Sequence, residues 1–146
     1  MRNFNRVSLP AFAGAMAIAL AGLGAMTVPA QAADGEKLFK RCVACHTLEE
    51  GKNKVGPSLA GVVGRTAGTA PAYKYSALNQ AAGAAGLVWT EENIVAYLPD
   101  PSAFLTQWLK DNGAADQAKG RSKMTFRMPK EADRQAVAEF LASQGK

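Results

Sequence analysis

The chain has 146 residues, of which 48% are hydrophobic and 20% charged, and its formal net charge is +5. This length allows one small domain and excludes a multidomain architecture. The composition is ordinary for a globular protein once the N-terminus is set aside.

The N-terminus has the pattern of a secretory signal peptide. Arg2 and Arg6 give it a positive start, and the apolar stretch at 9–26 carries no charge. The tripeptide Ala30-Gln31-Ala32 then supplies the small-x-small pattern of a cleavage site. We therefore expect residues 1–32 to be a cleaved signal peptide. The alternative is a retained membrane anchor, which the Ala- and Gly-rich composition and the cleavage pattern disfavour.

Export places the remaining domain, residues 33–146, in the periplasm or an equivalent compartment, which permits disulfides. Loss of Arg2 and Arg6 lowers the net charge from +5 to +3. An exported and mildly basic protein is a poor candidate for binding nucleic acid. It is better suited to docking on an acidic protein partner.

The exported part begins with a predicted helix. Asp34 is expected to cap its N-terminus. The apolar side of this helix is formed by residues spaced three and four apart, which places them on one face: Gly35, Leu38, Phe39 and Cys42. The helix therefore delivers the next motif at its C-terminal end.

That motif is Cys42-Val43-Ala44-Cys45-His46, which contains the only two cysteines and the only histidine of the chain. C-x-x-C-H is the attachment pattern of c-type haem. Two thiols at this spacing add across the two vinyl groups of one porphyrin edge, and the following imidazole lies beneath the iron as a ligand. The motif therefore predicts one haem c, bound covalently through two thioethers.

Other uses of the two cysteines explain the motif less well. A structural zinc site usually has four Cys or His ligands, and the chain has only three such residues. A thioredoxin-like dithiol requires alternating strand and helix patterns around it, and none appears. A plain disulfide remains open, although it leaves the adjacent His46 unexplained.

A loop rich in Gly, Lys and Asn follows at 49–61. Within it, Pro57 has a fixed φ and a carbonyl that is free to accept a hydrogen bond. Placed against the ring nitrogen of a ligating His46, this carbonyl would fix the tautomer and strengthen donation to the iron. An ordinary turn is the alternative.

Three helices are predicted in the middle of the chain. The first starts at Ser76 and is broken by Gly83 and Gly86. The second is capped by Thr90 and runs to Pro99. The third starts at Asp100-Pro101 as cap and first position and stops at Asn112-Gly113. Its expected buried side consists of Phe104, Leu105, Trp108 and Leu109.

A final helix is predicted at about 130–144 after a polar segment at 114–122, with an apolar stripe of Ala136, Val137, Phe140 and Leu141. No strand alternation of useful length is present. The prediction is an all-α domain with three main helices, short helices and long loops wrapped round the haem. Loops this long need another organiser in so small a domain, and the haem supplies one.

A second axial ligand must come from elsewhere, because the chain has one histidine. Three of the five methionines leave with the signal peptide, and Met124 and Met128 remain. Both lie in a Lys- and Arg-rich loop and not on an apolar helix face. Thioether ligation opposite His raises the reduction potential and fills the last coordination position, which indicates an electron carrier and not an enzyme.

The order of these motifs closely resembles that of the class I cytochromes c, over nearly the whole exported chain. The resemblance rests on the following segments: Cys42 to His46, Val55-Gly56-Pro57-Ser58-Leu59, Gly64-Arg65, Tyr73-Lys74-Tyr75, Trp89, and Lys123-Met124-Thr125-Phe126 before a terminal helix. It implies the cytochrome c fold. It also implies that Met124 is the distal ligand, with Met128 a bystander, and that the Pro57 carbonyl accepts from His46.

The resemblance assigns further residues to the haem. Arg65, Tyr75 and Trp89 are expected to hold the buried propionate charge, which needs donors. Asn79 and Tyr97 match positions that tune the methionine side, and Ser122 matches a hydroxyl near a propionate. Gly35, Phe39 and Phe140 match the crossing of the first and last helices.

Two departures from the family pattern are visible. Tyr73 stands where phenylalanine is common. The stretch between Phe104 and Ser122 is longer than in the mitochondrial form and resembles that of the long bacterial carriers. The resemblance therefore implies a periplasmic, monomeric one-electron carrier of a respiratory or photosynthetic chain. Such a carrier runs from a quinol-oxidising bc complex or a dehydrogenase to a terminal oxidase or photosynthetic reaction centre, and it meets the membrane only through these partners.

Lysines around an exposed haem edge are expected to steer docking on acidic faces of such partners: Lys40, Lys52, Lys54, Lys123 and Lys130. Three alternatives remain open. One is a haem enzyme or gas binder with an open sixth site. Another is a thiol-disulfide oxidoreductase using Cys42 and Cys45. The third is a dedicated subunit of one dehydrogenase.

Overall fold

The computed structural model describes residues 30–145, with side chains from Asp34 onward. Within this range the chain forms five α-helices and one 3-10 turn: α1 (Ala30–Phe39), α2 (Ala77–Ala84), α3 (Glu91–Tyr97), α4 (Pro101–Asp111), η1 (Ala115–Gln117) and α5 (Glu131–Ser143). Strand pairing in this part of the chain is limited to one isolated antiparallel bridge between Thr66 and Val88. The predicted all-α class is confirmed.

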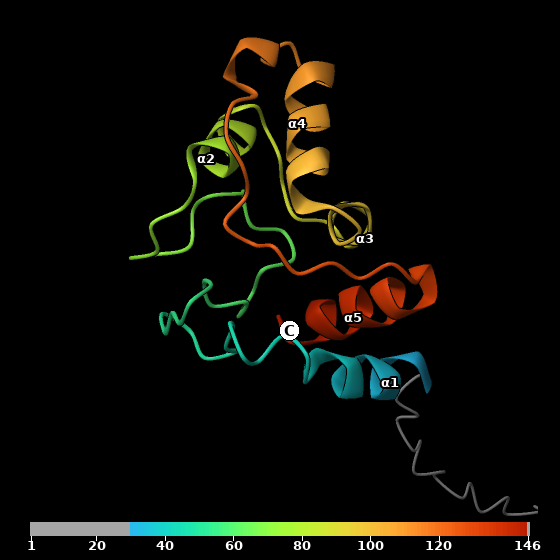
Figure 1. The fold of residues 1–146 in the computed structure, drawn as a ribbon. Helices are drawn as coiled ribbons and strands as arrows, with labels where there is room; N and C mark the ends of the chain where they lie inside the picture. Colours follow the sequence, from blue (N-terminus) through green and yellow to red (C-terminus); the bar gives the residue numbers. More distant parts are fainter. Residues whose placement is uncertain (1–29, 146) are drawn as a thin grey trace, which may run out of the picture.

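The helices form two pairs with α3 between them. Helices α1 and α5 lie side by side at one end of the molecule, and α2 packs against α4 at the other (Figure 1). Helix α3 contacts both α5 and α4. None of the helices in the described range is long and apolar enough to cross a membrane.

The crossing of α1 and α5 depends on a glycine. A Cβ atom at Gly35 would lie 2.1 Å from the carbonyl oxygen of Ala136, so only glycine allows the two backbones to approach this closely. Beside this contact the rings of Phe39 and Phe140 pack with their centroids 5.3 Å apart. The role predicted for these three residues at the helix crossing is confirmed.

The predicted start of the first helix is wrong. Helix α1 begins at Ala30, so Asp34 lies inside the helix instead of capping it. Its carboxylate instead faces Lys37 across one helical turn at 3.5 Å, in an exposed ion pair. An N-cap residue accepts from the unpaired amide groups of the first helical turn, which follow it in the chain. Asp34 cannot take this role for the start of α1, because the helix has already begun four residues earlier.

Helix α2 begins where expected, since the Ser76 hydroxyl accepts from the Asn79 amide. The expectation that Gly83 breaks it is wrong, because α2 continues to Ala84. A Cβ at Gly83 would lie 2.0 Å from the Ala67 carbonyl oxygen, so this glycine lets α2 pack closely against the loop that carries Ala67. Gly86, with φ +85°, stands beyond its end.

The caps of the next two helices are confirmed. The Thr90 hydroxyl accepts from the Asn93 amide at the start of α3. Asp100 caps α4 through the Ala103 amide, and Pro101 occupies the first turn. The second oxygen of Asp100 pairs with Arg127 at 2.7 Å, which ties the start of α4 to the loop before α5.

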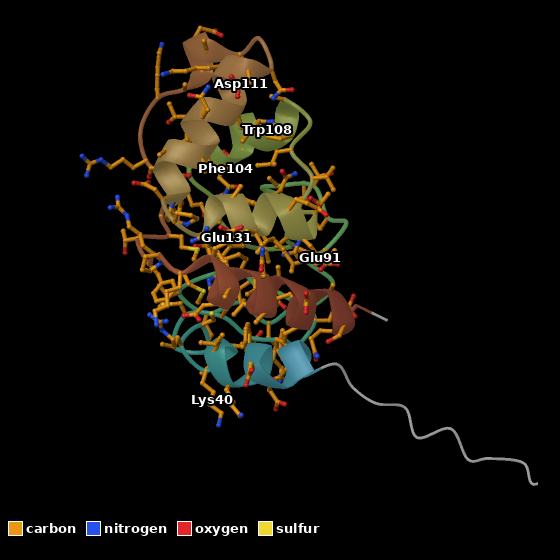
Figure 2. All side chains as sticks on the ribbon, turned by 90° about the vertical axis from the view of Figure 1, so that its right-hand side faces the viewer. Lys40, Glu91, Phe104, Trp108, Asp111 and Glu131 are labelled. Atoms are coloured by element: carbon orange, nitrogen blue, oxygen red, sulfur yellow. The ribbon has the colours of Figure 1, made fainter. Side chains whose placement is uncertain are left out.

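The buried side of α4 is narrower than expected. Leu105 and Leu109 are fully buried, whereas Phe104 and Trp108 are only half-buried. Both aromatic side chains emerge from α4, and Trp108 lies beside α2 (Figure 2). The Trp108 indole N–H donates to the Ala85 carbonyl at 3.3 Å, so this side chain fastens α4 to α2. Beyond α4, the polar segment at 114–122 contains the short η1 turn.

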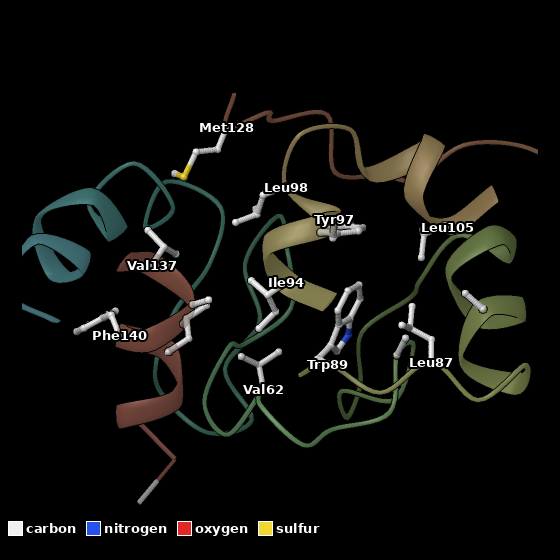
Figure 3. Packing of buried hydrophobic residues seen from close by; sticks show 14 of the residues in the cluster. Val62, Leu87, Trp89, Ile94, Tyr97, Leu98, Leu105, Met128, Val137 and Phe140 are labelled. Atoms are coloured by element: carbon white, nitrogen blue, oxygen red, sulfur yellow. The ribbon is translucent and has the colours of Figure 1, made fainter. Parts of the chain in front are cut away.

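The hydrophobic core is continuous from the α1–α5 pair to the α2–α4 pair (Figure 3). Trp89 and Tyr97 meet edge to face near its centre, with ring centroids 4.8 Å apart. Met128 is fully buried in this core. The predicted stripe on α5 is also buried, which confirms that prediction.

Candidate cofactor site

All eleven residues predicted for the site line one cavity of about 430 Å³. They are Cys42, Cys45, His46, Pro57, Arg65, Tyr75, Asn79, Trp89, Tyr97, Ser122 and Met124. They come from the turn after α1, the loops before α2, helices α2 and α3, the connection between these two helices, and the segment before α5. The cavity therefore lies where the two helix pairs meet.

One wall of the cavity holds His46. Its Nδ1 atom lies 2.7 Å from the Pro57 carbonyl oxygen, as expected from the sequence. Because a carbonyl can only accept, Nδ1 carries the proton and Nε2 is left unprotonated. Burial lowers the pKa of His46, and the hydrogen bond to Pro57 partly opposes this effect. The neutral imidazole is the form that ligates metals.

Gly56 makes room for this imidazole. A Cβ at this position would lie 2.4 Å from Cε1 of His46 and within 3 Å of both ring nitrogens. Gly56 was not predicted as a site residue from the sequence. The sequence feature that could have identified it is its position directly before Pro57, whose carbonyl was expected to accept from His46.

The two cysteines lie at the same wall as free thiols. Cys45 is exposed and Cys42 is half-buried. Burial raises the pKa of Cys42, and the neighbouring Arg41 partly opposes this rise. Both cysteines border the space that a ligand in the cavity would occupy.

Another part of the cavity wall carries the positive charge of Arg65. Arg65 donates two hydrogen bonds from its guanidinium group, to the carbonyls of Ser58 and Ala60 at 2.9 and 3.1 Å. Its Nε is buried and has no partner. A buried N–H without an acceptor costs about 1–3 kcal/mol. Burial also lowers the pKa of Arg65, since the charged form loses water. An acidic group in the cavity would remove both penalties.

Two other polar side chains line the same cavity. The Asn79 side-chain oxygen is also buried without a partner, and rotation of the amide would present its N–H₂ group instead. Burial raises the pKa of Tyr75, which keeps the hydroxyl protonated as a donor. The Tyr75 hydroxyl suits a carboxylate of a buried ligand, and the Asn79 amide can satisfy another polar group of that ligand.

The segment before α5 carries Met124, which is half-buried and lines the cavity. Its backbone amide donates to the Ser122 hydroxyl at 3.1 Å. The same hydroxyl lies 3.2 Å from the Tyr97 hydroxyl, and the Ser122 amide donates to Ser102 on α4 at 3.0 Å. Met128 does not line the cavity. The two methionines that the residue pattern left equivalent therefore have different surroundings.

Most of the remaining wall is apolar, and only two of its residues, Val137 and Leu141, were predicted from the sequence for packing. The group consists of Val55, Leu59, Val62, Ile94, Leu98, Phe126, Val137 and Leu141. Pairs spaced four apart on α3 and α5 were the signal that one helix face borders the site. At its rim the Arg41 guanidinium lies over the Phe126 ring, 5.1 Å from the centroid.

Comparison with known proteins identifies this arrangement. The family model for cytochrome c matches residues 32–145. The chain belongs to the cytochrome c family. It is similar to cytochrome c2 of Rhodopseudomonas palustris, with 59% identity over 112 residues, which cover 77% of this chain and 96% of the relative. It is also similar to cytochrome c2 iso-2 of Rhodospirillum centenum, with 57% identity over 110 residues, which cover 75% of this chain and 91% of the relative.

Solved structures agree with this assignment. The cytochrome c2 structure from Rhodospirillum centenum superimposes with a TM-score of 0.76 at 54% identity, covering 79% of this chain and 98% of that one. The ferricytochrome c2 structure from Rhodopseudomonas palustris gives a TM-score of 0.73 at 54% identity, covering 77% and 96%. The predicted class I cytochrome c fold is confirmed. The chain is an electron carrier with one covalently attached haem c.

The residues in the cavity fit this cofactor. Two free thiols stand beside an imidazole whose Nε2 is unprotonated. A thioether lies at another part of the same cavity. Arg65, which has an unpaired Nε, lines the cavity and suits the negative charge of a propionate, and the apolar wall suits the porphyrin face.

Proposed function

We propose that His46 and Met124 are the two axial ligands and that Cys42 and Cys45 form the two thioethers. The observation that carries this proposal is that one cavity is lined by all four residues, with His46 turned by the Pro57 carbonyl so that Nε2 is free. When bound, the haem supplies reversible one-electron oxidation and reduction of its iron. Arg65, Tyr75 and Trp89 hold the propionates, with Ser122 nearby, and Asn79 and Tyr97 tune the methionine side.

The chain itself keeps both ligands in place. Pro57 and Gly56 confine the His46 ring, while Ser122 and Tyr97 hold the segment that bears Met124. Ligands held in this way stay bound in both oxidation states, so each electron transfer requires little rearrangement. Two protein ligands also leave no coordination position for a substrate. The protein therefore transfers electrons and is not an enzyme.

We further propose that residues 1–32 are a signal peptide and that residues 33–146 act in the periplasm. Most of the proposed signal peptide lies outside the described residues, and α1 includes its last three positions. The proposal is supported by the family match, which begins at residue 32. It is also supported by the Rhodopseudomonas palustris relative, which matches along 96% of its own length but covers only 77% of this chain.

The proposed partners are redox proteins with acidic docking faces: a bc complex or a dehydrogenase as donor, and an oxidase or reaction centre as acceptor. Val43 and Val55 are the exposed large hydrophobic residues in the described range, and Val55 borders the cavity. Lys54 lies between them and donates to the Val43 carbonyl at 2.7 Å. An apolar patch beside a fixed cation suits brief contact with an acidic protein. The carrier acts as a monomer.

The lysines predicted to steer docking differ in their surroundings. Lys52 forms an ion pair with Glu49, which reduces its contribution to the field. Lys123 donates to the Lys74 carbonyl and lies over the Tyr73 ring. In the described part of the chain, ion pairs with acidic side chains are not formed by Lys40, Lys54, Lys123 or Lys130. These four are the proposed steering charges.

The visible spectrum of the purified holoprotein tests the ligands. The ferric protein is expected to show a weak band near the red end, which Met124→Ala abolishes and the matched variant Met128→Ala retains. Reduced Met124→Ala protein is expected to bind carbon monoxide. A band that persists in Met124→Ala would contradict the proposed ligation. Carbon monoxide binding by the unaltered protein would favour the open-site alternative.

A further inference from the structure

The peptide unit between Pro57 and Ser58 is held from both sides. Its carbonyl oxygen accepts from Nδ1 of His46 at 2.7 Å. Its N–H belongs to Ser58 and donates to the Asn53 side-chain oxygen at 2.9 Å. A peptide unit is planar and rigid, so a force on its N–H end sets the direction of its carbonyl. Asn53 is thus one peptide plane away from the imidazole.

Asn53 is itself held by a second contact. Its side-chain N–H₂ group donates to the Pro71 carbonyl at 2.8 Å. The orientation of the amide follows from its partners, because Ser58 N–H can only donate and the Pro71 carbonyl can only accept. Asn53 therefore joins the loop that holds His46 to the loop that precedes α2.

A neighbouring hydrogen bond joins the same two loops without touching this peptide unit. The Tyr73 hydroxyl donates to the Val55 carbonyl at 2.9 Å. Between the two attachment points, Ala72 has φ +57°, a left-handed conformation that residues other than glycine rarely adopt. Such a conformation persists when its surroundings over-determine it. The two contacts offer a matched pair for experiment, because both join the loops but only Asn53 touches the Pro57–Ser58 peptide.

We propose that Asn53 is a positioning residue for the proximal ligand, acting through the Pro57–Ser58 peptide unit. This inference rests on the proposed ligation by His46. Accepting from the N–H of a peptide unit polarises it and makes its carbonyl a better acceptor. A stronger bond from Nδ1–H to this carbonyl makes the imidazole a stronger donor to the iron, which stabilises the ferric state. Asn53 thereby lowers the midpoint potential and keeps the ring in one orientation.

Three variants of the holoprotein separate this role from simple loop attachment. Asn53→Leu removes both contacts of the amide and keeps a side chain of similar branched shape. Asn53→Asp keeps an oxygen for the Ser58 N–H but loses the donor to Pro71. Tyr73→Phe removes the other bond between the loops. The readouts are the solvent exchange rate of the His46 Nδ1 proton, measured by NMR on the reduced protein, and the midpoint potential of the two neutral variants.

In Asn53→Leu the Nδ1 proton is expected to exchange about three- to tenfold faster, the factor that one ordinary hydrogen bond contributes, and the midpoint potential to rise. Tyr73→Phe is expected to leave both quantities near those of the unaltered protein. Asn53→Asp should keep slow exchange, and it carries the test if Asn53→Leu fails to fold.

Equal acceleration in Asn53→Leu and Tyr73→Phe would overturn the proposal, because loop attachment alone would then account for it. Fast exchange in Asn53→Asp would also overturn it, since the contact to Pro71 would be the one that matters. Failure of the underlying ligation looks different. In that case the unaltered oxidised protein would lack the strongly shifted ring resonances of an iron-bound His46.

Discussion

Replacement of Gly56 by alanine tests the geometry around His46 most directly. The added Cβ would lie 2.4 Å from Cε1, 2.8 Å from Nδ1 and 2.9 Å from Nε2 of the imidazole. All three distances are too short for non-bonded atoms. The ring cannot turn away freely, because Nδ1 is hydrogen-bonded to the Pro57 carbonyl at 2.7 Å. The substitution must therefore displace either the ring or the loop.

The size of the effect follows from these contacts. Overpacking by one methyl group in a close-packed site typically costs about 1–3 kcal/mol. Loss of the hydrogen bond from His46 to Pro57 adds about 1 kcal/mol. We expect Gly56→Ala to lower the free energy of unfolding by about 2–4 kcal/mol. Guanidinium unfolding of the ferric holoprotein, followed by circular dichroism, measures it.

Gly51→Ala is the control for this experiment. Gly51 has φ +69°, and a Cβ added there would meet no atom within 4 Å, so alanine suffers backbone strain without a clash. Its expected cost is about 1 kcal/mol. If Gly56→Ala destabilises the protein no more than Gly51→Ala does, the idea that glycine makes room for the imidazole is refuted.

Three further predictions concern the core, the pH dependence and the docking surface. Met128→Ala removes a fully buried side chain and should lower the free energy of unfolding by about 2–5 kcal/mol; a loss below about 1 kcal/mol would show that the site collapses without a cavity. Burial raises the pKa of Tyr97 to about 12, so above pH about 10 the unfolded chain loses this proton while the folded one keeps it. Ionisation of Tyr97 should therefore leave the free energy of unfolding unchanged below that pH and lower it by about 3 kcal/mol on the way to pH 12. Unfolding titrations of Tyr97→Phe should lack this part of the decline, and an identical decline would contradict the assignment. Oxidation by an anionic protein partner should slow as salt rises, and Lys54→Gln should weaken that salt dependence in stopped-flow kinetics more than Lys110→Gln, which alters the far end of α4; a rate independent of salt would remove the case for steering.

Local chemistry explains which elements could be predicted from the sequence. The caps at Ser76, Thr90 and Asp100 were found because a side-chain oxygen three positions before a free amide is a short-range feature. The stripe on α5 follows from helical periodicity in the same way. The wrong prediction of an N-cap at Asp34 has the same origin, because a short-range pattern does not reveal that the residues preceding Asp34 are already helical.

Long-range contacts explain what could not be predicted. Gly83 has the local pattern of a helix breaker, yet its function is to let α2 approach the Ala67 carbonyl. Asn53 lies in a loop whose composition indicates only a turn, and its two partners are brought to it by folding. The unpaired Nε of Arg65 likewise exists only once the Ser58 and Ala60 carbonyls occupy its other N–H groups.

The cofactor and its attachment could be predicted from the chain alone, because two thiols and an imidazole must lie within five consecutive residues to bind one porphyrin edge. The residue pattern did not distinguish Met124 from Met128, since both lie in the same polar stretch. Folding separates them, placing Met124 at the cavity and burying Met128 in the core. The physical reason is that the covalent motif is closed within one turn of chain, whereas the surroundings of each methionine are formed by residues distant in sequence.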